Sequence, residues 1–219
     1  MKTSIQRFPV RQICAAVTLA LGPSIADADP PSFRGLGTGF YPVGLSADGT
    51  TVVGATGSGT VKWTETTGWV YLGPFRPSDV SADGSVVVGW NAAGQAIGQA
   101  IRWTPDGEVT LGVLPGYAES VATAVSGNGE VVVGTCYILG FPYSTTEAFF
   151  WSEATGMVGL EDVPGGLMQS SAAAVSDDGS VVAGNGVGPP ISGVGMELAV
   201  RWSPPPASGC SASPRTGWC

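Results

Sequence analysis

The chain has 219 residues, of which only 12% are charged and 34 are glycine, and it contains no histidine. So few charges and so many glycines argue against charge-driven disorder and against long solvent-exposed helices. The absence of histidine excludes Ser-His-Asp catalysis, Cys-His catalysis and every metal site that needs an imidazole ligand.

Residues 1–28 match a secretory signal peptide. Basic residues come first, an apolar run follows over residues 13–22, and Ala26 and Ala28 form a small-x-small cleavage site. The apolar run is too short for a membrane-spanning helix, which needs about 20 residues. The alternative is an uncleaved amphipathic N-terminus. We therefore expect a secreted protein, located in the periplasm, at the cell surface or outside the cell.

Cleavage after Ala28 leaves a strongly acidic chain. It removes three of nine basic residues and one of 17 acidic residues, so the net charge becomes −10. Such a surface repels nucleic acid and anionic lipid, and we expect neither as a partner. No later segment is long and apolar enough to predict insertion into a membrane after cleavage.

One short unit recurs four times in residues 29–203, and a Pro/Ser/Gly-rich tail follows over 204–219. Each unit begins with a Ser-x-Asp-Gly-like string that runs into valines, at residues 45–54, 80–89, 125–134 and 175–184. A short segment that ends in tryptophan follows in each unit, at Trp63, Trp103, Trp151 and Trp202.

Each part of the unit has a structural interpretation. The Asp-Gly or Asn-Gly pairs predict tight turns, because glycine adopts a positive φ without steric cost; these glycines are Gly49, Gly84, Gly129 and Gly179. The valine runs predict strands covered on both faces. A second set of glycines is expected to end those strands at a bulge or a close backbone approach, at Gly54, Gly89, Gly134 and Gly184. The recurring tryptophans favour packing between units over ligand contact.

Each unit is thus predicted to be an antiparallel meander of four short strands. A unit of about 35 to 50 residues cannot bury both its faces alone and must stack on its neighbours. Four-stranded blades of a β-propeller meet that need, and we expect an all-β, propeller-like fold. A β-solenoid is the alternative, but its parallel strands fit the Asp-Gly hairpin turns less well.

The two ends of the repeat array leave its closure open. No strand pattern follows Trp202, whereas residues 33–37 read as an isolated strand before the first unit. If that strand completes the last unit, four repeats close into a ring. The alternative is a fragment of a longer array, with exposed edges.

Length variation points to a binding face. The distance from the second-strand glycine to the tryptophan grows from 9 residues in the first unit to 18 in the fourth. In an antiparallel meander this variable connection and the one between units share one face. The candidate ligand-binding residues there are aromatic or amide side chains, namely Trp90, Asn91, Gln95, Tyr137, Phe141 and Tyr143. They suit an unknown carbohydrate or protein ligand; alternatively the loops pack together and bind nothing.

Catalysis, cofactors and metals are not expected. The turn role of Asp48, Asp83 and Asp178 explains them without acid-base chemistry, and Asn128 takes that place in the third unit. No catalytic residues, no cofactor and no metal ligands are assigned. A secreted carbohydrate-active enzyme remains the alternative. Cys210 and Cys219 are close enough in sequence to form a disulfide. Cys136 would then be the one cysteine of the mature chain without a disulfide partner.

The combination of motifs at residues 80–116 and 147–184 resembles the bacterial extracellular HAF repeat. That family is named for a His-Ala-Phe triplet before Arg-Trp, and here the histidine is replaced in every copy, as at Gln99 and Glu147. The resemblance covers about residues 33–203. It implies export and a propeller-like repeat domain, without an agreed activity. The chain shows no anchor or translocator pattern, which puts the surface attachment of longer members in doubt.

Overall fold

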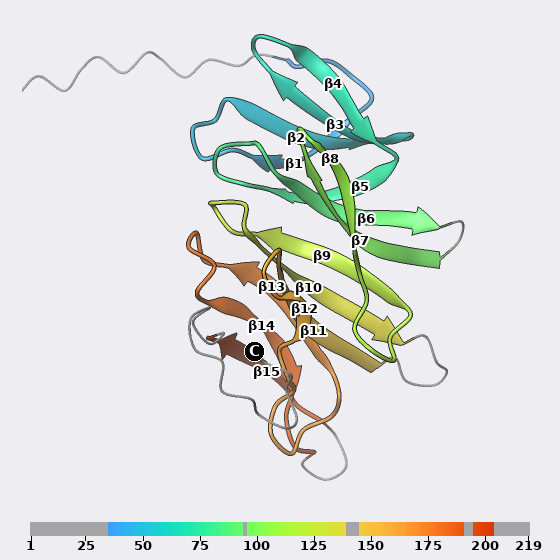
Figure 1. Cartoon of the computed structure of the whole chain (residues 1–219), viewed down its shortest axis with the longest axis vertical. Helices are drawn as coiled ribbons and strands as arrows, with labels where there is room; N and C mark the ends of the chain where they lie inside the picture. The colour runs from blue at the N-terminus through green and yellow to red at the C-terminus, as the bar shows by residue number, and fades with distance from the viewer. Residues whose placement is uncertain (1–34, 94–95, 139–144, 191–194, 204–219) are drawn as a thin grey trace, which may run out of the picture. The chain divides into compact units, whose positions relative to one another are not determined.

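The computed structural model describes residues 35–93, 96–138, 145–190 and 195–203 (Figure 1). In this part of the chain fifteen strands form four antiparallel sheets, all within the unit Thr38–Cys219. It holds no helix long and apolar enough to cross a membrane. The predicted signal peptide at 1–28, the tail at 204–219 and the cysteines Cys210 and Cys219 lie outside the described residues.

The four sheets follow one another along the chain, and within each sheet the strands pair in sequence order. The first contains β1 (Tyr41–Leu45), β2 (Thr51–Thr56), β3 (Gly59–Thr64) and β4 (Gly68–Gly73). The second contains β5 (Phe75–Val80), β6 (Val87–Ala93), β7 (Ala96–Thr104) and β8 (Gly107–Gly112). The third contains β9 (Glu119–Val125), β10 (Val131–Ile138), β11 (Thr145–Ser152) and β12 (Gly156–Gly159). The fourth contains β13 (Ser170–Val175), β14 (Val182–Val187) and β15 (Glu197–Trp202).

This architecture confirms the predicted fold class, an all-β array of four antiparallel, propeller-like repeats. Each of the first three sheets is a four-stranded meander, which is the topology of a propeller blade. The fourth sheet has three strands in the described residues. Residues 35–37 of the expected N-terminal strand are irregular, while 33 and 34 lie outside the described part. The Gly-Leu-Gly sequence there has little tendency to form a strand, which accounts for the difference.

The Ser-x-Asp-Gly turn has the same hydrogen bonds in every repeat. In the second repeat the Ser81 hydroxyl donates to Asp83 Oδ1 at 2.6 Å, and the Val86 N–H donates to Ser81 Oγ at 3.0 Å. Gly84 has a φ of 70°, in the left-handed region that favours glycine. In the third repeat Asn128 Oδ1 accepts the equivalent bond from Ser126 at 2.6 Å, so asparagine fits the same turn. The turn therefore needs a short side chain with an acceptor oxygen.

The second set of glycines does not end the strands as expected, but the expected bulge or close backbone approach is confirmed. Gly89 lies inside β6, opposite a bulge in β5 between Pro77 and Asp79. A Cβ at Gly89 would run into the carbonyl oxygen of Arg76, so the close approach of two backbones explains the glycine. The equivalent glycines of the other repeats also lie within strands and close to a backbone carbonyl, namely Gly54, Gly134 and Gly184.

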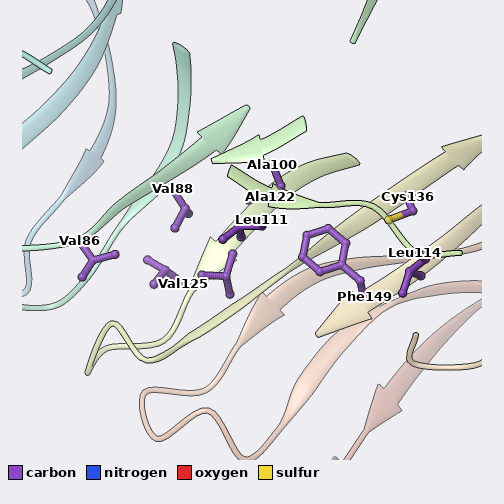
Figure 2. Close-up of a cluster of buried hydrophobic side chains, with 10 residues drawn as sticks. Val86, Val88, Ala100, Leu111, Leu114, Ala122, Val125, Cys136 and Phe149 are labelled. Atoms are coloured by element: carbon purple, nitrogen blue, oxygen red, sulfur yellow. The ribbon is translucent and has the colours of Figure 1, made fainter. Parts of the chain in front are cut away.

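The hydrophobic core lies between successive sheets. Val87 belongs to the cluster between the first and second sheets, whereas Val86 and Val88 belong to the cluster between the second and third. The second strand of the repeat is thus covered on both faces, as its unbroken valine run predicts. Figure 2 shows the cluster between the second and third sheets, where Phe149 packs among smaller side chains. The repeat tryptophans pack partly buried against these clusters, at Trp103, Trp151 and Trp202.

Successive repeats are also joined through their turns. The Ala47 N–H donates to the Ala82 carbonyl at 2.9 Å, and the Ala82 N–H donates to the Gly127 carbonyl at 3.0 Å. A third bond follows from the Asn128 N–H to the Asp177 carbonyl at 3.3 Å. We call this series of backbone bonds the turn ladder. It fixes each turn against the next one and so sets the stacking of the sheets.

Candidate functional site

The meander topology gives the sheets two chemically different ends. The turn end carries the turn ladder and the tight turns that follow the tryptophans. The loop end carries the connections of variable length between the second and third strands, and the connections between sheets. The sequence predicts the ligand-binding residues at the loop end.

The structure places three of the six predicted binding residues. Trp90 and Asn91 lie in β6, and Tyr137 lies in β10. All three are half-buried, near the ends of strands that lead toward the loop end. Gln95, Phe141 and Tyr143 lie outside the described residues.

The expected long loop in the second repeat is largely strand. β7 has nine residues, against six in its counterpart β3, because the hairpin continues the ladder to Ala93 paired with Ala96. Asn91 Oδ1 accepts the Gln99 N–H at 2.7 Å, so this amide oxygen serves the hairpin itself. The guanidinium of Arg76 lies 5.7 Å from the centre of the Trp90 ring, in cation–π range.

A small polar pocket lies at the loop end, between the third and fourth sheets. Its volume is about 150 Å³. Its lining is mainly hydroxyl, amide and carboxylate side chains together with backbone, contributed by Thr146, Gln169, Ser170, Ser171, Asn185, Gly186, Val187 and Glu197. Pockets that enclose a whole small molecule usually measure about 300 to 1,000 Å³. This one is large enough for a single polar group of a larger ligand.

Hydrogen bonds between the two sheets fix the walls of this pocket. Thr146 of β11 forms a parallel bridge with Gln169, and its N–H donates to the Met168 carbonyl at 3.4 Å. The Ala148 N–H donates to Ser170 Oγ at 3.0 Å, which ties the third sheet to the start of β13. The pocket walls are therefore parts of paired backbone, which favours a preformed site.

The loop end also holds a buried carboxylate that sequence reasoning missed. Glu119 is 6% exposed, and its Oε2 has no hydrogen-bond partner within the described part of the chain. Strand register places Glu119 opposite Tyr137, near the C-terminal end of β10. Glu119 reads as an ordinary strand start in the sequence, as do Thr146 and Glu197. No local signal marks any of the three.

A second acidic group consists of one carboxyl on the third sheet and one in the segment that follows it. Burial raises the pKa of Glu147 in β11 and the pKa of Asp162 just after β12. The Glu147 carboxylate lies over Gly159, where a side chain would collide with it. Burial also raises the pKa of the neighbouring Cys136 thiol to about 11, and its Sγ lies 3.6 Å from Met157 Sδ. Cys136 is therefore an unreactive core thiol rather than part of the exposed face.

The turn aspartates have the opposite electrostatic environment. The hydroxyl of Ser81 lowers the pKa of Asp83 to about 2, and the hydroxyl of Ser176 lowers that of Asp178 to about 2. Both carboxylates accept bonds from their own turns. Over the described ranges no three Cys, Asp or Glu side chains are grouped so that they would hold a metal ion.

Comparison with known proteins shows similarity in structure alone. No family model matches the chain, and no curated protein matches it. It is similar to a putative TolB from Agrobacterium tumefaciens, with 13% identity and a TM-score of 0.49 over 77% of this chain and 62% of that one. A TolB from Acinetobacter baumannii gives 14% identity and a TM-score of 0.47 over 72% and 39% of the two chains. A chain of the mitotic checkpoint complex gives 13% identity and a TM-score of 0.24 over 85% and 96%. This chain thus spans less than two thirds of the two TolB structures.

Proposed function

We propose that the protein is an exported, acidic repeat scaffold of the HAF-repeat type that binds a carbohydrate or protein ligand at its loop end. The polar pocket between the third and fourth sheets is the observation that carries this proposal. It combines hydroxyls, amides and a carboxylate, which are the groups that orient a polar ligand. Export is inferred from the signal-peptide pattern of residues 1–28.

The pocket size supports a surface-bound ligand. About 150 Å³ accepts one sugar substituent or one side chain of a partner protein. The rest of such a ligand would lie across the neighbouring loop end, where Trp90 and Tyr137 offer half-buried aromatic rings. Aromatic rings beside hydroxyls and amides are suited to stacking on sugars and to protein interfaces.

A glycan array followed by calorimetry with the strongest binder tests the proposal. Thr146→Val and Glu197→Gln remove pocket polarity with little change in shape, and we expect each to weaken binding about tenfold. Matched changes at the turn end, Thr66→Val and Glu153→Gln, should leave binding unchanged. A protein ligand is tested in the same way, with partners captured from the export compartment. Equal effects of both pairs of variants would contradict a loop-end site.

A secreted carbohydrate-active enzyme is the second candidate, and the acidic group of Glu147 and Asp162 favours it. Carboxyl groups with raised pKa values serve as general acids in glycoside hydrolysis, and Glu147 and Asp162 have that property. Release of reducing sugar from polysaccharides, lost in Glu147→Gln, would support this candidate. Binding without turnover would support the scaffold.

A further inference from the structure

The first and fourth sheets each have one face on which no neighbouring sheet packs in the described chain. On the outward side of the first sheet, Leu45 is 60% exposed and is paired with Val52. We call the outward side of this sheet, with Leu45 and the turn at Gly49, the head face. On the fourth sheet, Ala183 and Arg201 are exposed. We call the outward side of this sheet the tail face; it carries Val181, Ala183 and Arg201.

The three internal junctions show which side chains such faces use. At each junction a valine from the second strand of one repeat packs in the same hydrophobic cluster as the buried or partly buried valine that ends the first strand of the next repeat. The pairs are Val53 with Val80, Val88 with Val125, and Val133 with Val175. The register places Ala183 and Leu45 at the two corresponding positions of the terminal repeats. A small residue on one face thus corresponds to a large one on the other, which keeps the combined volume close to that of two valines.

A hydrogen bond from a basic side chain also occurs at two of the three junctions, whereas the third repeat has Phe150 at the donor position. Lys62 Nζ donates to the Gly84 carbonyl at 2.6 Å, and Arg102 donates to the Gly129 carbonyl at 3.1 Å. Each donor precedes the repeat tryptophan, and each acceptor is the glycine of the next turn. Arg201 has the same position in the fourth repeat, but its guanidinium donates to the exposed Ser203 hydroxyl. Its side chain therefore projects from the tail face without a turn opposite it among the described residues.

The turn glycines complete the match. A Cβ at Gly129 would lie 2.6 Å from Val86 of the preceding repeat, and a Cβ at Gly179 would lie 2.5 Å from Val131. The turn of one repeat thus packs against the start of the second strand of the preceding repeat. Nothing lies within 4 Å of a Cβ at Gly49, which is the head-face equivalent. On the tail face, Val181 is the residue that corresponds to Val86 and Val131.

We propose that the tail face of one chain binds the head face of a second copy. Gly49 of one chain is seated on Val181 of its neighbour, Leu45 packs against Ala183, and Arg201 donates to the Gly49 carbonyl. The contact continues the internal repeat junction between two chains. Among the described residues, Leu45, Ala183 and Arg201 are exposed, while Phe40 packs against Trp69 beside Leu45 on the head face. It is heterologous, so it generates closed rings or open filaments of several chains. The interface is independent of the pocket and of the ligand proposed above.

Sedimentation velocity of the full chain over a range of concentrations tests this interface. We expect concentration-dependent self-association that Leu45→Lys abolishes and Arg201→Gln weakens about tenfold. Val109→Lys is the matched control, because Val109 is 50% exposed but lies on β8 of the second sheet. Circular dichroism checks that each variant is folded. A chain that stays monomeric at about 100 μM, or association that persists in Leu45→Lys, would overturn the proposal.

Disulfide trapping distinguishes a second copy from closure of one chain on itself. Cys14, Cys210 and Cys219 are first replaced by serine. Chains with Ala47→Cys are then mixed with chains that carry Asp177→Cys, and we expect a cross-linked heterodimer after oxidation. The positive control is the internal pair Ala47→Cys with Ala82→Cys, whose backbones are 2.9 Å apart at the hydrogen bond. In a further experiment, Ala47→Cys and Asp177→Cys are placed in the same chain. If oxidation gives a cross-linked monomer and no dimer, binding of a second copy through these faces is ruled out.

Discussion

The guanidinium of Arg102 donates to the main-chain carbonyl of Gly129, one repeat further along the chain, with Nη2 at 3.1 Å. The same side chain lies 5.8 Å from the centre of the Trp151 ring. A single residue thus joins the strand before one tryptophan to the turn and the tryptophan of the next repeat. The same contact is made by Lys62 in the first repeat, so it accounts for the basic residue before two of the four repeat tryptophans.

Replacing this donor should destabilise the chain. Arg102→Met leaves the partly buried Gly129 carbonyl without its charged donor and removes the cation–π contact. We expect a loss of about 1.5 to 3 kcal/mol in the free energy of unfolding, measured with urea. Arg201→Met is the control, because that guanidinium is exposed, and it should cost less than about 0.5 kcal/mol at concentrations where the chain is monomeric. Equal losses in the two variants would show that the junction bond contributes nothing specific.

The turn glycines offer a direct test of packing between repeats. Gly129→Ala and Gly49→Ala both force alanine into a φ of 73°, which costs roughly 1 to 2 kcal/mol. The Gly129 substitution additionally places Cβ 2.6 Å from Val86 Cγ2, whereas open space surrounds Gly49. Overpacking of this kind costs typically 1 to 3 kcal/mol more.

A second substitution isolates the steric part of that loss. Val86→Ala removes the methyl groups that the new Cβ would meet. In the Gly129→Ala background it should therefore cost less than it does alone, as a double-mutant cycle in urea would show. Additive losses would mean that the two positions do not touch.

The turn aspartates should make the fold sensitive to acid. The Ser81 hydroxyl and the Ser85 N–H lower the pKa of Asp83 from 3.8 to about 2 in the folded chain. Because the folded pKa is the lower one, the stabilisation is present above pH 3.8 and disappears as the pH falls to about 2. Asp83→Asn should remove this part of the stability that the chain loses in acid, as urea unfolding midpoints at pH 7 and pH 2.5 would show. Its cost at pH 7 should be below about 1 kcal/mol, since Asn128 makes the same turn. Asp83→Ala should cost more at pH 7.

Local chemistry explains why much of this fold follows from the sequence. An Asp-Gly pair specifies its turn from within five residues, and a run of three valines requires cover on both faces wherever it lies. The pocket follows from neither rule. Thr146 and Glu197 belong to different repeats and become neighbours through the stacking of two sheets. Trp90 was expected in a loop because chain length alone does not distinguish a longer loop from a longer hairpin.

The buried acid Glu147 should behave in the opposite way to the turn aspartates. Burial raises its pKa above 4.5 in the folded chain, so its ionised form opposes folding at neutral pH. Glu147→Gln removes that charge, and we expect a gain in stability at pH 7, kept below about 1 kcal/mol because solvent screens the half-buried group. The gain should shrink as the pH falls toward 4.5, since the wild-type carboxyl then takes up a proton in the folded state. Thermal unfolding across this pH range measures the effect. Glu153→Gln, at an exposed position in the turn before β12, should show no such trend, and a less stable Glu147→Gln at pH 7 would mean that the charge supports the fold.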